Sequence, residues 1–323
     1  MRKGFLFLAK CKVLRIKKNV PTTWQEALQQ FMFWKQAEGK SERTLLDYHC
    51  SISLFFKRFP QAYRQELLKT SAFEHMSQPV KPATYNLRLI YLKTFFIWCI
   101  KEGIFTENPL EGFKKRKDEG RTVNLDNDTL INLISLPDKR TFSGLRDYTL
   151  ILLTLDTGIR PGEAYNLLKD DINFKSLEVY IRQEVSKTRT SRTLIISPIT
   201  ANTMRELMQS RHVSWKNNVP LLCTFEGNKL NAFTWGDRLE MYSKKLGVKI
   251  RPYDLRHAFA LEFIRNGGNA LALQRTLGHT DLTMTKRYVA LTQQDLREQH
   301  TLASPLNKLL PQRHRIRKIK ADK

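Results

Sequence analysis

Four short segments in the second half of the chain carry the side chains best suited to chemistry. They are Thr157-Gly158-Ile159-Arg160-Pro161-Gly162-Glu163, Tyr253-Asp254-Leu255-Arg256-His257, Leu277-Gly278-His279 and Lys286-Arg287-Tyr288. Two guanidinium groups held in fixed positions can clamp a phosphate through paired hydrogen bonds. A tyrosine hydroxyl held in line with a phosphorus atom is a competent covalent nucleophile. Together these residue types predict a site that breaks a phosphodiester bond by forming a phosphotyrosine.

The content, order and spacing of these segments resemble those of the tyrosine recombinases, also called the phage integrase family. The resemblance extends from near Thr23 to near Leu302. It implies an enzyme that cuts and rejoins duplex DNA through a 3′-phosphotyrosine and a free 5′-hydroxyl. Because the phosphoester bond is conserved in such a reaction, resealing needs no ATP, metal ion or other cofactor. The implied fold is mainly α with a small antiparallel β-sheet, arranged as a two-domain DNA clamp.

The resemblance also implies a role for each residue of the four segments. Arg160 binds the scissile phosphate, and Glu163, three residues later on the same helical face, orients Arg160 or a neighbouring group. Arg256 holds the other non-bridging oxygen and stabilises charge in the pentacoordinate transition state. His279 donates a hydrogen bond to a non-bridging oxygen, and Tyr288 is the nucleophile.

A further basic residue is expected on a turn between two strands, Ser186-Lys187-Thr188-Arg189-Thr190-Ser191-Arg192. The tip of a hairpin can reach into a groove of DNA, and the resemblance implies that Lys187 protonates the 5′-oxygen leaving group. The flexible stem and readily shifted pKa of lysine suit a general acid. Arg189 and Arg192 are rival basic residues on this turn, and we expect both to contact backbone phosphates.

One position departs from the family pattern. The residue three before Arg256 is usually a histidine proposed to accept a proton, and here it is Tyr253. A phenol with a pKa of about 10 is a poor general base at neutral pH, although it can donate a hydrogen bond to the phosphate. We therefore expect an active enzyme with altered or slower proton handling. His257 follows Arg256 but lies roughly 100° away around a helix, so we interpret it as structural.

Composition favours a nucleic-acid-binding enzyme. The 323 residues are enough for two domains, and a hydrophobic fraction of 41% excludes a disordered protein. The net charge of +24 implies a polyanionic partner, nucleic acid before membrane. Cysteines are scattered and suggest neither a zinc site nor a disulfide framework, and no apolar run is long enough to span a membrane. These features indicate a cytoplasmic, nucleoid-associated protein with reduced thiols.

The first part of the chain is expected to form a small α-helical domain over residues 20–112, after a basic extension over residues 1–19. Thr23 and Glu26 suit a capping box at the start of its first helix, and Ser41 suits the start of its second. A short third helix is expected over residues 63–68, and a fourth runs from near Pro82 to Gly103. This domain resembles the SAM-like core-binding domain of recombinases, and Arg43, in its second helix start, is a candidate DNA contact.

A basic linker is expected over residues 113–123. Its candidate DNA-binding residues are Lys114, Lys115, Arg116 and Lys117. A charged run of this kind between two DNA-binding domains favours contact with the phosphate backbone over simple solvation. It resembles the interdomain linker of recombinases that close around DNA.

The catalytic domain is expected over residues 124–301, followed by a basic tail over residues 302–323. Asp126 suits a helix N-cap, a second helix should end at Gly158, and Pro161 suits the first turn of the next. Short strands near residues 172–174, 177–181 and 193–196 predict a small antiparallel sheet. From residue 199 onward the pattern is helical again.

The expected partners are duplex DNA carrying specific recombination sites and further copies of this chain, forming a tetramer in synapsis. A second recombinase or a directionality factor is a further candidate. The favoured role is integrase or transposase of a phage or mobile element, and the alternative is a chromosome-dimer resolvase of the same family. An alternative from another class is an accessory DNA-binding protein with impaired catalysis, which Tyr253 alone encourages.

Overall fold

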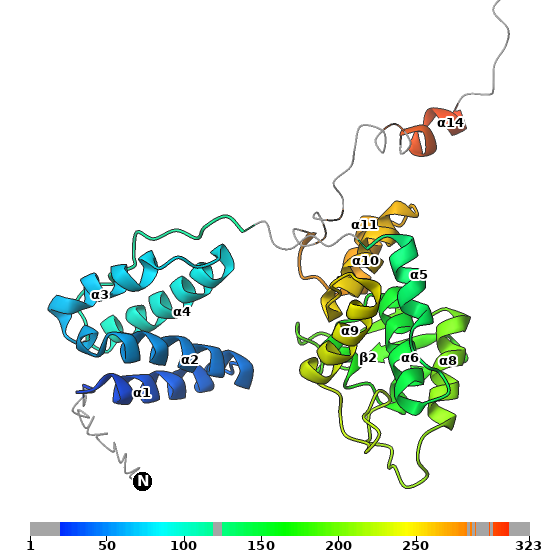
Figure 1. Cartoon of the computed structure of the whole chain (residues 1–323). Helices are drawn as coiled ribbons and strands as arrows, with labels where there is room; N and C mark the ends of the chain where they lie inside the picture. The colour runs from blue at the N-terminus through cyan, green and yellow to red at the C-terminus, as the bar shows by residue number, and fades with distance from the viewer. Residues whose placement is uncertain are drawn as a thin grey trace, which may run out of the picture. The chain divides into compact units, whose positions relative to one another are not determined.

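The computed structural model describes residues 20–118, 125–282, 285, 288, 297 and 300–309. The expected N-terminal extension, Lys286, Arg287 and the chain beyond residue 309 therefore lie outside the described residues. The chain divides into two compact units, Met1–Arg121 and Thr122–Lys323 (Figure 1). The finer division expected from the sequence stays a prediction. Within the described ranges no helix combines the length and apolar character needed to cross a membrane.

The first unit is helical. It contains α1 (Trp24–Ala37), α2 (Glu42–Arg58), the 3₁₀ helix η1 (Pro60–Tyr63), α3 (Gln65–Ser77) and α4 (Pro82–Lys101). Capping hydroxyls define where α1 and α2 begin. Thr23 accepts a hydrogen bond from the Glu26 amide and Ser41 accepts one from the Thr44 amide, both at 3.3 Å. The Glu26 carboxylate returns to the Thr22 amide at 2.9 Å rather than to Thr23, so the expected capping box forms only in part.

The third helix is longer than the sequence indicated. The pattern predicted a helix over residues 63–68, whereas α3 begins at Gln65 and ends at Ser77. The side chains that α3 buries include Ser71 and His75. Polar residues therefore interrupt the apolar stripe by which an amphipathic helix is recognised in a sequence.

The core of the first unit is built from aromatic rings. The fully buried Phe31 lies edge-to-face with Phe95, Tyr48 and Trp98, with ring centroids 5.2, 5.4 and 5.5 Å apart. Such pairs stabilise a fold beyond the area that they bury. These contacts hold α1, α2 and α4 together.

The second unit packs helices around a small sheet. Its elements are α5 (Asn127–Ser135), α6 (Phe142–Thr157), α7 (Pro161–Ala164), η2 (Lys169–Asp171), β1 (Ile172–Asn173), β2 (Glu178–Ile181), β3 (Arg192–Ile195), α8 (Pro198–Gln209), α9 (Ala232–Leu246), α10 (Pro252–Arg265), α11 (Ala270–Leu277) and α14 (Leu306–Leu309). The strands follow the order β1-β2-β3, and both pairs are antiparallel. The mainly α fold with a small antiparallel sheet is therefore confirmed. Between α8 and α9 the chain is not helical, contrary to the pattern expected from residue 199 onward.

The turn after α6 is fixed by a glycine. Gly158 has a φ of 62°, in the left-handed region. A Cβ there would lie 2.3 Å from the Phe259 ring and 2.7 Å from Leu277. Backbone conformation and space therefore both require glycine, and the turn brings the segment after α6 against α10 and α11.

A buried ionic network joins α6 to α9. The fully buried Asp147 carboxylate accepts hydrogen bonds from Arg146 at 2.7 and 3.0 Å, from Arg238 at 2.5 Å and from Tyr242 at 2.9 Å. Arg146 also donates to the Cys223 carbonyl at 3.1 Å. This network fixes the two helices relative to each other and to the segment that precedes α9.

Candidate active site

Arg160 lies between the end of α6 and the first turn of α7. Glu163, at the end of that turn, is 1% exposed, and its carboxylate accepts hydrogen bonds from the Arg160 amide at 3.2 Å and from Arg160 Nη1 at 3.1 Å. This carboxylate orients the guanidinium in the way that the sequence led us to expect.

Arg192 occupies a different place from the one expected. Its guanidinium donates to both carboxylate oxygens of Glu163, from Nη1 at 2.9 Å and from Nη2 at 2.6 Å, and its side chain is 9% exposed. The two parallel bonds make the bidentate pair for which arginine is suited. Arg192 is thus held by Glu163 inside the protein, and this geometry favours a positioning role over contact with backbone phosphates.

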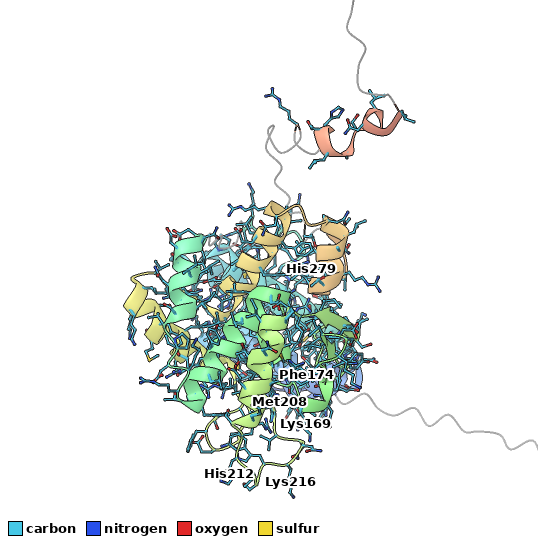
Figure 2. The ribbon with its side chains drawn as sticks, turned by 90° about the vertical axis from the view of Figure 1, so that its right-hand side faces the viewer. Lys169, Phe174, Met208, His212, Lys216 and His279 are labelled. Atoms are coloured by element: carbon cyan, nitrogen blue, oxygen red, sulfur yellow. The ribbon has the colours of Figure 1, made fainter. Side chains whose placement is uncertain are left out.

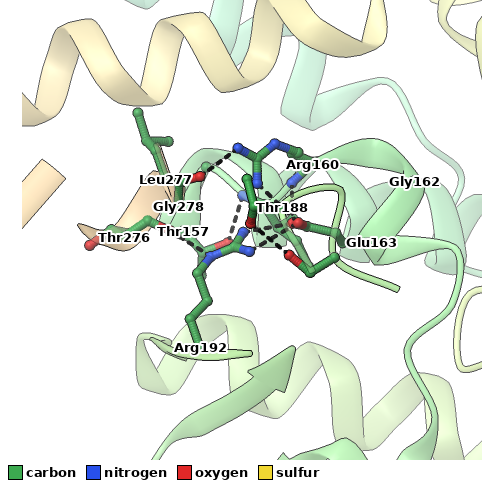
Figure 3. A network of polar contacts seen from close by, with 12 residues as sticks. Thr157, Arg160, Gly162, Glu163, Thr188, Arg192, Thr276, Leu277 and Gly278 are labelled. Carbon is green, nitrogen blue, oxygen red and sulfur yellow. Dashed lines mark hydrogen bonds and ion pairs between the residues drawn. The ribbon is translucent and has the colours of Figure 1, made fainter. Parts of the chain in front are cut away.

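Three arginines donate to the carboxyl end of α11, and two of them, Arg160 and Arg192, are labelled in Figure 3. Arg192 Nε donates to the Thr276 carbonyl at 3.0 Å, Arg256 Nη2 to the Leu277 carbonyl at 2.8 Å, and Arg160 Nη2 to the Gly278 carbonyl at 2.8 Å. The last carbonyls of a helix lack partners within it and carry partial negative charge. The Leu277-Gly278-His279 segment therefore places the guanidiniums as well as supplying a histidine.

Arg256 is the most deeply buried of these arginines. It lies in the first half of α10, donates to the Gly158 carbonyl from Nη1 at 2.5 Å, and is 4% exposed. Burial, and then the positive charge of Arg160, lower the pKa of Arg256 to about 10. Arg256 is therefore still a cation at neutral pH, whereas the carboxylate of Glu163 pairs with Arg160 and Arg192.

Glu163 remains anionic in this cluster. Burial would raise the pKa of its carboxyl, but the hydrogen bonds and charges of Arg192, and then those of Arg160, outweigh burial and hold the pKa below its ordinary value. The cluster therefore keeps a positive surplus, and a phosphate diester would offset part of it.

His279 is held by both ring nitrogens. Nε2 lies 3.2 Å from Arg256 Nη2, and Nδ1 lies 3.0 Å from Thr285 Oγ1. Burial, followed by the charges of Arg256 and Arg160, lowers the pKa of His279 to about 4. The imidazole is therefore neutral at pH 7, and since a guanidinium can only donate, Nε2 accepts in this arrangement.

Tyr288, the expected nucleophile, contacts a histidine that sequence reasoning set aside. Its hydroxyl lies 2.5 Å from His257 Nδ1, and the two ring centroids are 5.8 Å apart. His257 was interpreted as structural because it projects away from Arg256 around the helix. The structure brings Tyr288 to that side, and adjacency to Arg256 was the one signal in the sequence that could have indicated it.

Tyr253 lies at the start of α10 with half of its surface exposed. Its hydroxyl makes no hydrogen bond to any described residue. Among the described residues, the hydrogen bonds of Arg160, Arg256 and Tyr288 go to partners other than Tyr253.

Lys187 and Arg189 lie on the connection between β2 and β3, and both side chains are exposed. Arg189 has a φ of 53°, which marks a tight turn there. Thr188, between them, is drawn among the residues of the Arg160 and Glu163 network (Figure 3). The structure does not bring Lys187 into contact with the arginines, but it places Lys187 next to a residue of their network.

The basic residues expected to bind DNA in the first unit are all exposed, and two of them have described side-chain partners. Arg43 is exposed and pairs with Asp47 at 3.2 Å. Arg116 has its guanidinium 3.8 Å from the centre of the Tyr85 ring, and its backbone is held by Asn86 at 2.8 and 2.9 Å. The other three candidates are Lys114, Lys115 and Lys117. The start of the expected linker is thus anchored on α4.

The cluster lies near one end of the second unit. In Figure 2, His279 is at the opposite end from the loop that carries His212 and Lys216. Across the described parts of the chain, no three His, Cys, Asp or Glu side chains are grouped so that they could hold a metal ion.

This fold and site define a class of DNA-processing enzyme. A model of the phage integrase family matches residues 124–295, which is more than half of the chain. The chain therefore belongs to the phage integrase family, the tyrosine recombinases, whose members cleave and rejoin DNA.

Similar proteins match over most of the chain. Tyrosine recombinase XerA of Pyrococcus horikoshii is 28% identical over 278 residues, which cover 84% of this chain and 92% of the relative. Tyrosine recombinase XerC of Proteus mirabilis is 27% identical over 303 residues, which cover 89% and 96%. Among solved structures, the Tn1549 transposon integrase in complex with a circular intermediate DNA has a TM-score of 0.66 at 19% identity, covering 86% of this chain and 99% of that one. At this identity the structural likeness shows a shared fold.

Proposed function

We propose that this chain is a site-specific recombinase that cuts duplex DNA with Tyr288 and reseals it without ATP. The observation that carries the proposal is the convergence of Arg160 and Arg256 on the two successive carbonyls that precede His279. Two guanidiniums fixed side by side form a receptor for the non-bridging oxygens of a phosphodiester. The Tyr288 hydroxyl lies 2.5 Å from Nδ1 of His257, the residue that follows Arg256 on α10, which supports a role for Tyr288 at this site.

In the proposed reaction, Tyr288 Oη attacks the scissile phosphorus, the new O–P bond forms, and the bond to the 5′-oxygen breaks. Arg160 and Arg256 stabilise the charge that develops on the non-bridging oxygens. Lys187 gives a proton to the leaving 5′-oxygen, which requires the turn between β2 and β3 to bring its ammonium to the DNA. Rejoining follows the same steps in reverse on a new 5′-hydroxyl.

His279 can assist through a change of tautomer. A phosphate oxygen that replaces Arg256 as the partner of Nε2 requires a proton on that nitrogen. Thr285 makes the change possible, because a hydroxyl can accept from Nδ1 in one tautomer and donate to it in the other. His279 then donates to a non-bridging oxygen while remaining neutral.

The proposal is tested by trapping the covalent adduct. Purified protein is mixed with a pool of nicked duplexes cut from its native flanking DNA, and the products are separated on a denaturing gel beside Tyr288→Phe. We expect a labelled adduct that survives denaturation with the wild-type chain and disappears with the variant. Salt-sensitive binding by both proteins without an adduct would instead support the accessory DNA-binding role.

Two biological roles fit this chemistry, and both are proposals. The first is integrase or transposase of a mobile element, acting in the cytoplasm as a tetramer on two recombination sites. The second is chromosome-dimer resolution by a recombinase of the same family. Sequencing the DNA from trapped adducts distinguishes them, because a mobile element yields its own two ends and a resolvase yields one chromosomal site.

A further inference from the structure

His257 and Tyr288 form a close contact within the candidate active site. The Nδ1 atom of His257 lies 2.5 Å from Tyr288 Oη, which is at the short end of hydrogen-bond distances. His257 is on α10, directly after Arg256, so the helix that fixes one phosphate-binding guanidinium also fixes this imidazole. The proposed nucleophile therefore has a nitrogen base in contact with its hydroxyl.

A proton acceptor beside Tyr288 would remove the hydroxyl proton that otherwise limits the nucleophilic strength of its oxygen. The hydroxyl of a tyrosine with a pKa of about 10 is almost fully protonated at neutral pH, and its oxygen gains nucleophilic strength when the proton is removed during attack. Imidazole is the side chain best matched to that task near neutral pH.

The other candidates for this acceptor are placed less well. Tyr253, at the position where the family usually has a histidine, is another phenol and has no described contact with Tyr288. His279 already accepts from Arg256 and is bound to Thr285 through its second nitrogen. The carboxylate of Glu163 is held by two arginines, which makes it a weak base.

We infer that His257 is a catalytic residue that accepts the proton of Tyr288 on Nδ1 during strand cleavage. This inference rests on the proposed function. As Tyr288 Oη bonds to phosphorus, its proton passes to Nδ1 of the neutral imidazole, which becomes an imidazolium. The bond from phosphorus to the 5′-oxygen breaks with its electron pair, and that oxygen takes a proton from Lys187. On rejoining, His257 returns its proton to the departing tyrosine oxygen.

The test separates proton transfer from hydrogen bonding. In His257→Asn, the amide oxygen can occupy the place of Nδ1 and accept a hydrogen bond, but it cannot take a proton. We expect single-turnover adduct formation to slow by about 10²- to 10⁴-fold, the usual contribution of general base catalysis. DNA affinity and the melting temperature should stay close to those of the wild type. His212→Asn, an exposed histidine far from the site, is the matched control and should cleave normally.

A fluorinated tyrosine at position 288 then decides the role. Fluorine lowers the pKa of the phenol. A fluorinated tyrosine therefore loses its proton to solvent more readily and depends less on a general base. Incorporation of difluorotyrosine at position 288 should restore much of the rate lost in His257→Asn. Wild-type cleavage by His257→Asn, or a slow variant that difluorotyrosine does not restore, would overturn the inference.

A second substrate distinguishes deprotonation of the nucleophile by His257 from protonation of the leaving group by Lys187. A duplex with sulfur in place of the 5′ bridging oxygen has a leaving group that needs no protonation. It should restore cleavage by Lys187→Ala and leave His257→Asn slow; equal restoration of both would contradict the assignment. Absence of an adduct from the wild-type chain on every duplex would refute the proposed function itself, whereas the outcomes above bear on His257.

Discussion

A single buried carboxylate, that of Glu163, determines where two arginines can act. Arg160 and Arg192 both bind this carboxylate. Arg160 uses only Nη1 of its two terminal nitrogens for Glu163, and its Nη2 donates to the Gly278 carbonyl, directly before His279. Arg192 uses all three guanidinium nitrogens within the protein, on Glu163 and on Thr276. At the residue scale, then, burial and pairing distinguish Arg160, proposed to bind phosphate, from Arg192, for which the pairing favours a positioning role.

This separation predicts different salt dependences for two neighbouring arginines. Arg192→Ala should leave the slope of log Kd against log salt unchanged, because Arg192 is bound to Glu163 rather than to a phosphate. Arg189→Ala should reduce that slope by about one, since the exposed Arg189 is expected to contact a phosphate. Arg192→Ala should also slow adduct formation, because Glu163, which orients Arg160, loses a partner that fixes it. Fluorescence anisotropy over a salt series measures both slopes, and an equal loss of slope would show that Arg192 contacts DNA.

The hydroxyl of Thr285 should matter for cleavage because it serves both tautomers of His279. Thr285→Val keeps the shape and removes the hydrogen bond to Nδ1, which corresponds to about 1 kcal/mol and a several-fold slower adduct formation. Thr203→Val is the matched control, because Thr203 is also buried but donates to a backbone carbonyl within α8. An equal effect of both substitutions would exclude a specific role for Thr285.

A buried histidine in the first unit predicts how stability depends on pH. His75 is fully buried between Phe55 and Phe59, and neither ring nitrogen has a hydrogen-bond partner among the described residues. Burial, followed by the charges of Arg88 and Arg58, lowers the pKa of His75 to about 4.

Because the unfolded chain binds this proton with a pKa of about 6.5, protonation favours unfolding between the two values. The stability that neutral His75 provides is complete above pH 6.5 and is lost as the pH falls toward 4. His75→Leu should flatten the change in melting temperature between pH 7 and pH 5. A variant whose melting temperature falls as steeply as that of the wild type would show that other groups control this range.

At the scale of elements, local chemistry predicted where most segments begin and end. Asp126 caps α5, Pro161 begins α7, and Gly158 ends α6, as their residue types indicated. The three strands were also predicted, since β-branched and aromatic residues alternate between turn signals. The full length of α3 was missed because its buried face includes polar residues such as His75.

Contacts between distant segments were beyond the reach of sequence patterns. The bidentate pair of Arg192 with Glu163 joins β3 to α7, and the contact of His257 with Tyr288 joins α10 to the segment after α11. Each depends on packing that no local spacing encodes. Residue types and their order in the sequence indicated the candidate reacting groups. The partners that orient those groups could be identified only from the three-dimensional structure.

The network around Asp147 predicts a large loss of stability from a single change. Asp147→Ala would leave the buried Arg146 and the half-buried Arg238 without their shared carboxylate. Removing one partner of a buried ionic network typically costs about 3–5 kcal/mol, because the remaining charge is left uncompensated. In a domain of this size that loss corresponds to a melting temperature lower by roughly 10 °C. Differential scanning calorimetry measures it, and a shift of a degree or two would show that water replaces the carboxylate.

At the scale of the whole molecule, assembly is expected to depend on the end of the chain. The described C-terminal segment exposes Leu302, Leu306 and Leu309, with 77%, 58% and 71% of their surfaces accessible. Apolar side chains grouped in this way on a short segment indicate a surface for another protein. The basic residues that follow, among them Arg313, Arg315 and Arg317, are suited to nonspecific contact with DNA.

Two triple variants separate these contributions. Replacing the three leucines with serine should leave adduct formation on single nicked sites near the wild-type rate, because the active-site cluster is untouched. The same variant should form fewer complexes containing four chains and two DNA sites, because the surface proposed to join neighbouring copies has lost its apolar side chains. Replacing the three arginines with glutamine should instead weaken DNA binding and reduce its salt dependence. Mass photometry of the complexes, with recombination measured in parallel, tests the pair. Full assembly and recombination by the leucine variant would show that copies of this chain associate through another surface, and the tail would then serve DNA affinity alone.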